Sequence, residues 1–289
     1  MNDWAPALRV GFWMTVTAIG FAVMLNTVRH LSDGGMDVFV VAFWRNVFSI
    51  LFFLPLIPHF WQSRLGAARW HLYSLRALIM TVSSITLFAG AILLPVAEAT
   101  ALSFTTPLFT VIGAILFLGE AVGWRRWSAV IVGFGGTLLM LRPGEEAFQL
   151  GALVVLVAAI TFAGVTLMGK GLVRHDSPAL VTLNLSLYSL PFSLIPALYF
   201  WEWPSAEQWP WLGLLGFSAI CNIYGITEAL KAGDASLLQP FDFLRLPFTA
   251  LGAYLMFGQV PTLWVWIGAG VIAGSSVYIA QREARLNRQ

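Results

Sequence analysis

Apolar runs of about twenty residues recur along the whole chain, and short polar connections separate them. A helix of about 20 apolar residues is long enough to cross the hydrocarbon core of a bilayer. The run from Ala152 to Val165 does not alternate apolar and polar residues, so it predicts a helix and not a strand of a membrane barrel. The pattern predicts an all-α polytopic membrane protein with ten transmembrane helices, over residues 7–29, 36–57, 71–93, 96–118, 126–141, 149–170, 178–200, 209–230, 235–257 and 261–281.

The two halves of the chain match when the first is shifted along the second by 139 residues. The matched positions include Phe109-Thr110, Gly113-Ala114 and Gly119-Glu120, which lie over Phe248-Thr249, Gly252-Ala253 and Gly258-Gln259. Near the starts of the halves, Ala18-Ile19 matches Ala159-Ile160 at a shift of 141 residues. Each half holds five predicted spans, and because five is odd, the second half must enter the membrane from the opposite side. We therefore expect two inverted five-helix repeats, over residues 1–143 and 144–289.

The composition also indicates a membrane protein, because 58% of the 289 residues are hydrophobic and only 10% are charged. A soluble domain carries about 25% charged residues and rarely exposes large apolar patches. The mean hydropathy of +0.80 points the same way. These values argue against a soluble enzyme, a disordered chain and a nucleic-acid binder. The single cysteine, Cys221, excludes an internal disulfide and a thiolate metal site.

Lys and Arg are distributed unevenly between the two sets of connections. Short cytoplasmic loops of membrane proteins carry an excess of these residues. With the N-terminus inside, the cytoplasmic segments hold Arg64, Arg69, Arg125, Arg126, Lys170, Arg174, Lys231, Arg282, Arg285 and Arg288, with Arg9 at the edge. The opposite loops hold only Arg29 and Arg142. We expect a multi-pass protein of a bacterial-type inner (plasma) membrane with both termini in the cytoplasm.

Inverted repeats with this number of spans are typical of secondary transporters, which bind substrate near the midplane where the repeats meet. Exchange of conformations between the two halves would produce inward-open and outward-open states. The competing interpretation is a duplicated scaffold without a transport role, such as a membrane-embedded enzyme or a receptor.

Short motifs stand near the ends of the predicted spans. They are Ala97-Glu98-Ala99, Thr105-Thr106-Pro107-Leu108, Phe117-Leu118-Gly119-Glu120 and Leu141-Arg142-Pro143-Gly144, followed in the second half by Ala235-Ser236-Leu237-Leu238-Gln239-Pro240 and Phe257-Gly258. This set resembles the signature of the EamA family in the drug/metabolite transporter superfamily. The resemblance covers the whole chain and implies a secondary transporter of small organic metabolites with a central cavity. Gln259 departs from the family pattern, which often has Glu there, as Glu120 is in the first half.

Asp242 and Arg245 lie inside the ninth predicted span and share one helical face at a spacing of three residues. A charge at the centre of a membrane helix costs about 2.5–3.5 kcal/mol on insertion scales, so each one needs a reason. Pro240 and Pro247 bracket the pair and predict a helix break, where transporters often bind substrate. We expect both charged residues to contact substrate, and the alternative is a structural ion pair.

The repeat register places Ser103 and Thr106 at the positions of Asp242 and Arg245, next to the helix-breaking Pro107. Both halves thus offer a polar face that proline interrupts. We therefore add Ser103 and Thr106 to the expected substrate contacts.

Further polar and aromatic residues lie within the predicted spans. Arg45 and its repeat partner Asn184 are expected either to bind ligand or to form helix-packing hydrogen bonds. Arg76 either lines the inner vestibule or extends to the cytoplasmic interface. Glu98 and Asp242 are candidates for proton coupling, although Glu98 also suits a helix N-terminus. The aromatic residues expected at cavity depth are Trp13, Trp44, Tyr188, Tyr224, Phe241 and Phe243.

Signatures of other function classes are missing from the sequence. It contains no nucleotide-binding GxxxxGK[ST] loop, and its four histidines do not cluster. We therefore expect no ATP-driven step within this chain, no metal site, no cofactor and no enzyme activity.

The intramembrane arginines favour a substrate with a carboxylate or phosphate group. The main hypothesis is a secondary active transporter that exports an amino acid or a related carboxylate-bearing metabolite by alternating access. The alternative is an uptake carrier for a larger nucleoside-like or aromatic metabolite, such as S-adenosylmethionine or riboflavin, and a membrane-embedded enzyme or sensor is a remote third. The expected partners are the substrate and the lipid bilayer, without nucleic acid, for a monomer or a homodimer.

Overall fold

The computed structural model describes residues 6–53, 69–106, 108–110, 112–113, 128, 131–132, 135–136, 150–173, 175–232, 241–242, 244–271 and 274. Across these residues the protein is helical and contains no strand. The helices are α1 (Pro6–Asp33), α2 (Val38–Phe53), α4 (Trp70–Leu93), α5 (Val96–Ser103), α8 (Leu150–Leu172), α9 (Pro178–Tyr199), α10 (Gln208–Ala232) and α12 (Arg245–Phe257), and a further helical segment covers residues 263–271. The prediction of an all-α protein is confirmed for this part of the chain.

Five of the helices are long and apolar enough to cross a membrane: Arg9–Asp33, Trp70–Leu93, Leu150–Gly169, Pro178–Tyr199 and Gln208–Ala229. Helix α2 is apolar but shorter. The predicted span 126–141 falls almost entirely outside the described residues. Ten complete spans are therefore not seen, although each of the five long helices lies where a span was predicted.

The predicted span that begins at residue 96 is interrupted. Helix α5 ends at Ser103, and the Phe104 N–H donates to the Ala101 carbonyl at 3.2 Å. A proline at position 107 has no N–H to donate to the Ser103 carbonyl. The Thr106 hydroxyl donates to that carbonyl at 2.8 Å instead, so a side chain replaces the missing backbone bond.

The predicted span 235–257 also differs, because helix α12 begins only at Arg245 and Leu244 lies in a turn. Asp242 therefore precedes this helix and does not lie inside a continuous one. Under the 139-residue shift, Leu244 corresponds to Thr105, which also lies in a turn. The interruptions thus fall at equivalent positions of the two halves.

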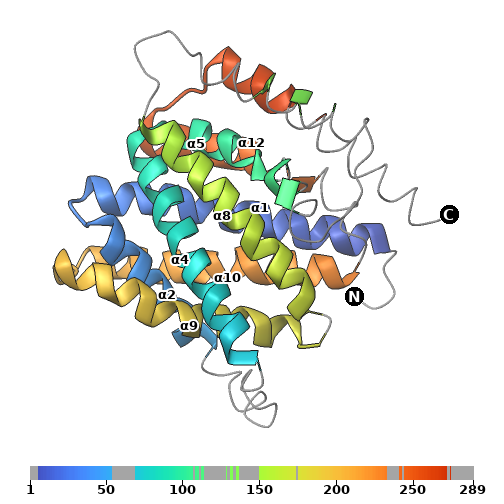
Figure 1. The fold of residues 1–289 in the computed structure, drawn as a ribbon. Coiled ribbons are helices and arrows are strands. Elements are labelled where there is room, and N and C mark those ends of the chain that lie inside the picture. The colour runs from blue at the N-terminus through green and yellow to red at the C-terminus, as the bar shows by residue number, and fades with distance from the viewer. Residues whose placement is uncertain are drawn as a thin grey trace.

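The helices of the first half pack mainly on helices of the second half. Figure 1 shows α1 beside α10 and α4 beside α8, and α2 packs on α9. The repeat register makes α1, α2 and α4 equivalent to α8, α9 and α10. Exchanging the halves converts the α1–α10 contact into α8–α4 and the α2–α10 contact into α9–α4, and each of these contacts is present. These contacts between helices are therefore related by the exchange of the two halves.

One hydrogen bond repeats in the same way. The Ser83 hydroxyl of α4 donates to the Ala158 carbonyl of α8 at 3.0 Å. The Asn222 amide of α10 donates to the Thr17 carbonyl of α1 at 3.2 Å. The shift of 139 residues relates Ser83 to Asn222, and the shift of 141 relates Thr17 to Ala158. Equivalent side chains thus fasten the two equivalent helix pairs.

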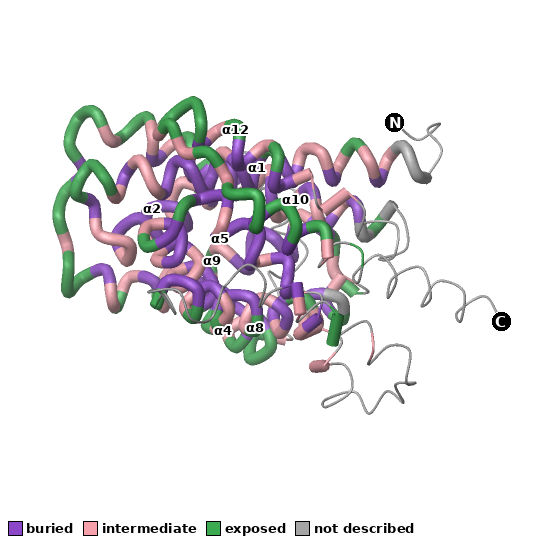
Figure 2. The backbone as a smooth tube through the Cα atoms, turned by 90° about the horizontal axis from the view of Figure 1, so that it is seen from above, coloured by how far each residue is buried: buried purple, intermediate pink, exposed green. Residues whose placement is uncertain are grey.

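The core runs between the helices, and apolar side chains also cover the outside. The largest buried cluster joins residues such as Leu25, Val40, Phe88 and Leu215 from four different helices. Figure 2 shows buried positions on the inward faces of the tubes and exposed positions along the outer ones. Large apolar side chains on these outer faces include Leu153, Ile195, Leu198, Leu251 and Leu255. Exposed apolar side chains of this kind suit a lipid environment.

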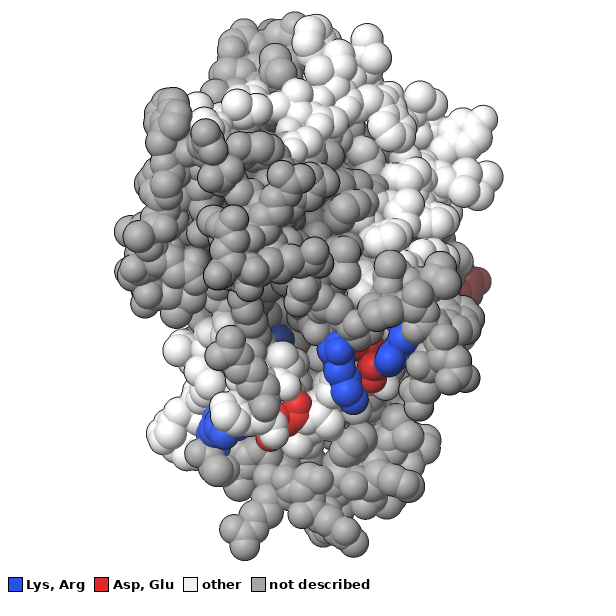
Figure 3. All heavy atoms as spheres, turned by 90° about the vertical axis from the view of Figure 1, so that its right-hand side faces the viewer, with Lys and Arg blue, Asp and Glu red and all other residues white. Residues whose placement is uncertain are grey.

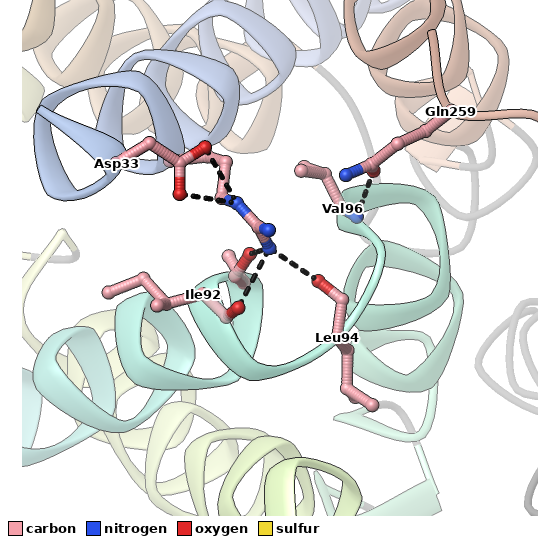
Figure 4. Close-up of polar contacts among 7 residues, drawn as sticks. Asp33, Ile92, Leu94, Val96 and Gln259 are labelled. Carbon is pink, nitrogen blue, oxygen red and sulfur yellow. Dashed lines mark hydrogen bonds and ion pairs between the residues drawn. The ribbon is translucent and has the colours of Figure 1, made fainter. Parts of the chain in front are cut away.

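We call the end of the bundle at which α1 ends the distal end, and the end at which it begins the proximal end. At the distal end, Arg29 donates to the Asp33 carboxylate at 3.1 Å. Its second donor group reaches the carbonyls of Ala91, Ile92 and Leu94 at 2.7–3.2 Å, as Figure 4 shows. The last carbonyls of a helix lack partners within it, so Arg29 satisfies the end of α4.

A residue from the second half supports the same turn. The Gln259 side-chain oxygen, just after α12, accepts from the Val96 N–H at 3.1 Å (Figure 4). Val96 is the first residue of α5, whose early N–H groups have no helical acceptor. We call Arg29, Asp33 and Gln259, with the turn at residues 91–96, the distal clamp.

Candidate functional site

The predicted charged pair forms at the start of α12. The Arg245 Nη2 and the Asp242 Oδ1 lie 2.8 Å apart. The Arg245 guanidinium carbon lies 4.9 Å from the centre of the Phe21 ring on α1. The Arg245 Nε is buried and has no hydrogen-bond partner. The turn at Leu244 thus places an ion pair with one unused donor between α12 and α1.

Arg45 lies at the centre of a hydrogen-bonded network that joins three helices. It donates to the Ser84 hydroxyl of α4 and to the Asn46 side-chain oxygen, both at 2.8 Å. The Asn46 amide donates to the Ser193 hydroxyl of α9 at 3.0 Å. The guanidinium also lies 5.6 Å from the centre of the Phe88 ring. Arg45 is buried and has no acidic partner among the described residues.

Arg76 is also buried and is less completely bonded. Its Nε donates to the Val165 carbonyl of α8 at 3.2 Å, whereas its Nη1 has no partner. A Cβ at Gly169 would lie 2.8 Å from its Nη2, so glycine at that position makes room for the guanidinium. The structure shows no acidic partner for Arg76 in the part of the chain that it describes.

Tyr73 lies one helical turn before Arg76, and its hydroxyl donates to the Asp176 carboxylate at 2.7 Å. The rings of Tyr73 and Tyr188 stand nearly parallel, with centroids 5.9 Å apart. Asn184, one turn before Tyr188 on α9, is fully buried beside Tyr73, and neither atom of its amide makes a hydrogen bond of ordinary geometry to the described residues. We call Tyr73, Arg76, Asn184 and Tyr188 the proximal polar cluster.

The predicted aromatic residues of α1 and α10 meet each other. The rings of Trp13 and Tyr224 lie edge to face with centroids 5.7 Å apart. The Tyr224 hydroxyl donates to the Glu228 carboxylate at 2.9 Å. Phe241 packs beside Trp13 and precedes the charged pair directly in the chain. These aromatic residues therefore lie beside the charged pair, on its proximal side. The predicted Phe243 lies outside the described residues.

Other predicted residues lie apart from these groups. Trp44 packs against Trp201, Trp203 and Trp209 in an aromatic cluster near the connection between α9 and α10. Glu98 lies in the first turn of α5, beside the distal clamp.

The predicted hydroxyl-bearing residues are bonded locally, and the structure describes only one of the three predicted prolines. Ser103 donates to the Thr100 carbonyl at 2.6 Å, and the Thr106 hydroxyl is bonded to Ser103, so both are used within their own segment. Pro247 is the third residue of α12, where a helix tolerates proline. The predicted helix breakers Pro107 and Pro240 lie outside the described residues.

The structure adds neighbours that the sequence prediction did not name as site residues. Tyr73 could have been found, because it lies three residues before Arg76 and so on the same face of one helix. Phe21, Phe88 and Ser193 carry no such signal, since their positions depend on how the helices pack against each other.

Charged side chains lie on the surface at the proximal end. Figure 3, which views the side on which α1 begins, shows acidic and basic side chains close together. One such pair joins Arg69 and Asp176, with 3.6 Å between nitrogen and oxygen. Asp176 also accepts from Tyr73, so this surface pair connects directly to the proximal polar cluster.

A pocket of about 650 Å³ opens at the distal end, between the turn that joins α1 to α2 and the connection that joins α9 to α10. Its lining includes Ser32, Met36, Ile92, Phe200 and Glu202, and no predicted site residue. The candidate residues are therefore grouped elsewhere, between the helices.

Comparison with known proteins places this arrangement in a family. The profile of the EamA-like transporter family matches residues 8–142 and again residues 149–281. The chain is 34% identical to a riboflavin transporter of Vibrio cholerae serotype O1, over 98% of this chain and 96% of that protein. It is 30% identical to an S-adenosylmethionine uptake transporter of Rickettsia bellii, over 99% and 98%. A crystal structure of a protein with 18% sequence identity shares the fold, with a TM-score of 0.63 over 95% of this chain and 99% of that one. The chain belongs to the EamA-like transporter family.

Proposed function

We propose that this membrane protein is an uptake carrier for a metabolite that contains a heteroaromatic ring, with riboflavin as the first candidate substrate. Its relatives support this alternative better than the export of an amino acid, because they are named for riboflavin and for S-adenosylmethionine uptake. Both compounds carry a planar heterocycle. The proposal therefore rests on the ring that the two named substrates share.

We propose further that the carrier works by alternating access of two inverted five-span repeats, divided near residues 143 and 144, with both termini in the cytoplasm. The symmetric helix contacts and the matched hydrogen bonds of Ser83 and Asn222 support this arrangement. On this assignment the proximal end faces the cytoplasm. Proton coupling through Asp242 or Glu98 remains a prediction.

One observation carries the choice between the two ring-bearing candidates. Arg45 and Arg76 are buried and have no acidic partner among the described residues. A buried cation without a partner is costly, so such residues usually serve a ligand. Excess positive charge repels the cationic sulfonium of S-adenosylmethionine, whereas the carbonyl groups of a neutral flavin ring accept hydrogen bonds from guanidinium groups. This difference favours riboflavin.

The test is counterflow of labelled riboflavin into proteoliposomes loaded with unlabelled riboflavin. Exchange without chemical change supports a carrier, and formation of a product supports an enzyme. Arg245→Ala should abolish exchange, because it removes the guanidinium at the helix break, while the protein stays folded in detergent. Lys231→Ala, which removes an exposed cation at the end of α10, should exchange normally. Exchange of S-adenosylmethionine or an amino acid, without riboflavin exchange, would overturn the assignment.

A further inference from the structure

The proximal polar cluster contains two buried groups whose hydrogen-bonding atoms are unused. Asn184 is 0% exposed and lies beside the Tyr73 hydroxyl, and neither its amide nitrogen nor its amide oxygen makes a hydrogen bond of ordinary geometry to the described residues. Arg76 is 7% exposed, and its Nη1 lacks a partner. Most buried polar side chains in folded proteins are hydrogen-bonded, so two exceptions in one cluster need an explanation.

The other buried asparagines among the described residues each have at least one hydrogen-bonded amide atom. Asn46 donates to Ser193 and accepts from Arg45. Asn222 donates to the Thr17 carbonyl, and Asn26 donates to two carbonyls. Helix packing therefore satisfies at least one atom of each of these amides. Asn184 alone among these four has both atoms unused, which separates it from an ordinary packing residue.

The surroundings of Asn184 are aromatic and cationic. Tyr188 follows it by one turn on α9, is only half-buried, and stands nearly parallel to Tyr73 of α4. Arg76 lies one turn after Tyr73 on α4. A planar carboxamide, a tyrosine ring and a guanidinium with a free donor thus converge from two helices.

This combination suits the edge of a heteroaromatic ring. A carboxamide presents one acceptor and two donors in a plane, which lets asparagine bind a donor and an acceptor on the same base edge. A tyrosine ring offers a stacking face that any planar heterocycle fits. A guanidinium adds donors for a ring carbonyl.

We propose that Asn184 recognises the hydrogen-bonding edge of the substrate ring, that Tyr188 stacks on the ring, and that Arg76 donates to an acceptor on the same edge. The inference rests on the proposed function, because it assigns part of the transported molecule to this cluster. Since Asn184 is fully buried in this structure, the ring enters when α4 and α9 separate at the proximal end. The unused atoms are then satisfied by substrate.

The experiment compares the purified wild-type protein with Asn184→Leu, Asn184→Ala and Thr182→Val. Thr182 is the matched control, because it is buried on the same helix and its hydroxyl is bonded within that helix, to the Pro178 carbonyl. The two ligands are riboflavin and riboflavin methylated at the ring nitrogen N3, which lacks the edge donor. Binding is followed by riboflavin fluorescence, and stability by thermal unfolding without ligand.

Wild-type protein and Thr182→Val should bind riboflavin about tenfold or more tightly than the methylated compound. Asn184→Leu and Asn184→Ala should bind the two compounds equally. Asn184→Leu should unfold at the same temperature as wild type or higher, because it removes polar atoms that have no partner. A purely structural asparagine would instead leave the ligand preference intact and lower the unfolding temperature of both variants.

Two outcomes overturn the inference: a preserved preference for riboflavin in both Asn184 variants, or a loss of stability in both while Thr182→Val is normal. Failure of the wild-type protein to bind riboflavin overturns the choice of substrate instead. The same comparison then uses S-adenosylmethionine and its N6,N6-dimethyl analogue, which lacks the donor on the adenine edge. If the Asn184 variants weaken the binding of S-adenosylmethionine and of its dimethyl analogue equally, the inference is overturned for this substrate as well.

Discussion

The distal clamp and the proximal polar cluster each contain an arginine that reaches a neighbouring helix, but the distal arginine makes more hydrogen bonds than the proximal one. Arg29 donates to one carboxylate and to three carbonyls at the end of α4. Arg76 donates to one carbonyl, and its Nη1 has no partner. An arginine side chain therefore joins helices at the distal end, whereas at the proximal end an arginine keeps a donor that no described residue accepts from.

The difference indicates where the bundle resists opening. A polar network whose members are all bonded holds its elements in one arrangement, whereas a partly bonded one destabilises the state in which it is buried. The distal end is thus the better bonded of the two ends, and on the proposed mechanism the proximal end gains hydrogen bonds when water or substrate reaches it. A carrier that alternates between two states needs such an imbalance, reversed when substrate binds.

The largest expected effect comes from removing the arginine of the distal clamp. Arg29→Met leaves three carbonyls and the Asp33 carboxylate without their donor, so the free energy of unfolding should fall by about 2 kcal/mol. Thermal unfolding in detergent, followed by circular dichroism, measures the loss. Arg29→Lys keeps the charge but lacks the fork of donors, so its loss should be smaller. Unchanged stability of Arg29→Met would show that the clamp does not hold the distal end.

The proximal arginine should behave in the opposite way. Arg76→Met removes a buried guanidinium that has no acidic partner among the described residues, so the protein without ligand should become more stable by about 1 kcal/mol. Riboflavin exchange in proteoliposomes should nevertheless fall, because the variant loses a donor to the substrate.

Arg45→Met is the matched control for that variant, because Arg45 is equally buried but is bonded to Ser84 and Asn46. Its removal takes the donor away from the Ser84 hydroxyl and from the Asn46 side-chain oxygen, so stability should decrease and not increase. The same sign of change in both arginine variants would contradict the distinction between bonded and unbonded guanidinium groups.

Much of this fold follows from hydrophobic patterning alone. The predicted spans 71–93 and 178–200 correspond closely to Trp70–Leu93 and Pro178–Tyr199, because helix length in a membrane is set by the apolar run. The helix-breaking Pro107 predicts an interruption in this region, but the end of α5 at Ser103 depends on local hydrogen bonds of hydroxyl groups, which the apolar pattern does not show.

The candidate site was only partly predictable. Arg45, Arg76 and Arg245 can be picked out from the sequence, because a charge within an apolar run has a high free-energy cost in the membrane and so needs a reason. Their neighbours depend on how each helix is rotated, which one sequence does not encode locally. Arg29 shows the limit, because its position near a predicted loop made it a marker of orientation and concealed its bonds to the end of α4.

The smallest expected change in stability comes from substituting Gln259, which shows whether the second half contributes to the distal clamp. Gln259→Leu removes the acceptor of a single hydrogen bond, from the Val96 N–H, so the free energy of unfolding should fall by about 1 kcal/mol, less than for Arg29→Met. Gln259→Glu keeps an acceptor and places negative charge at the N-terminus of α5, so it should be at least as stable as wild type. Thermal unfolding of both variants beside Arg29→Met gives the ranking. If Gln259→Leu lowers the free energy of unfolding as much as Arg29→Met does, closure at the distal end depends on the second half as much as on α1. The clamp would then join the two halves and not merely the helices of the first half.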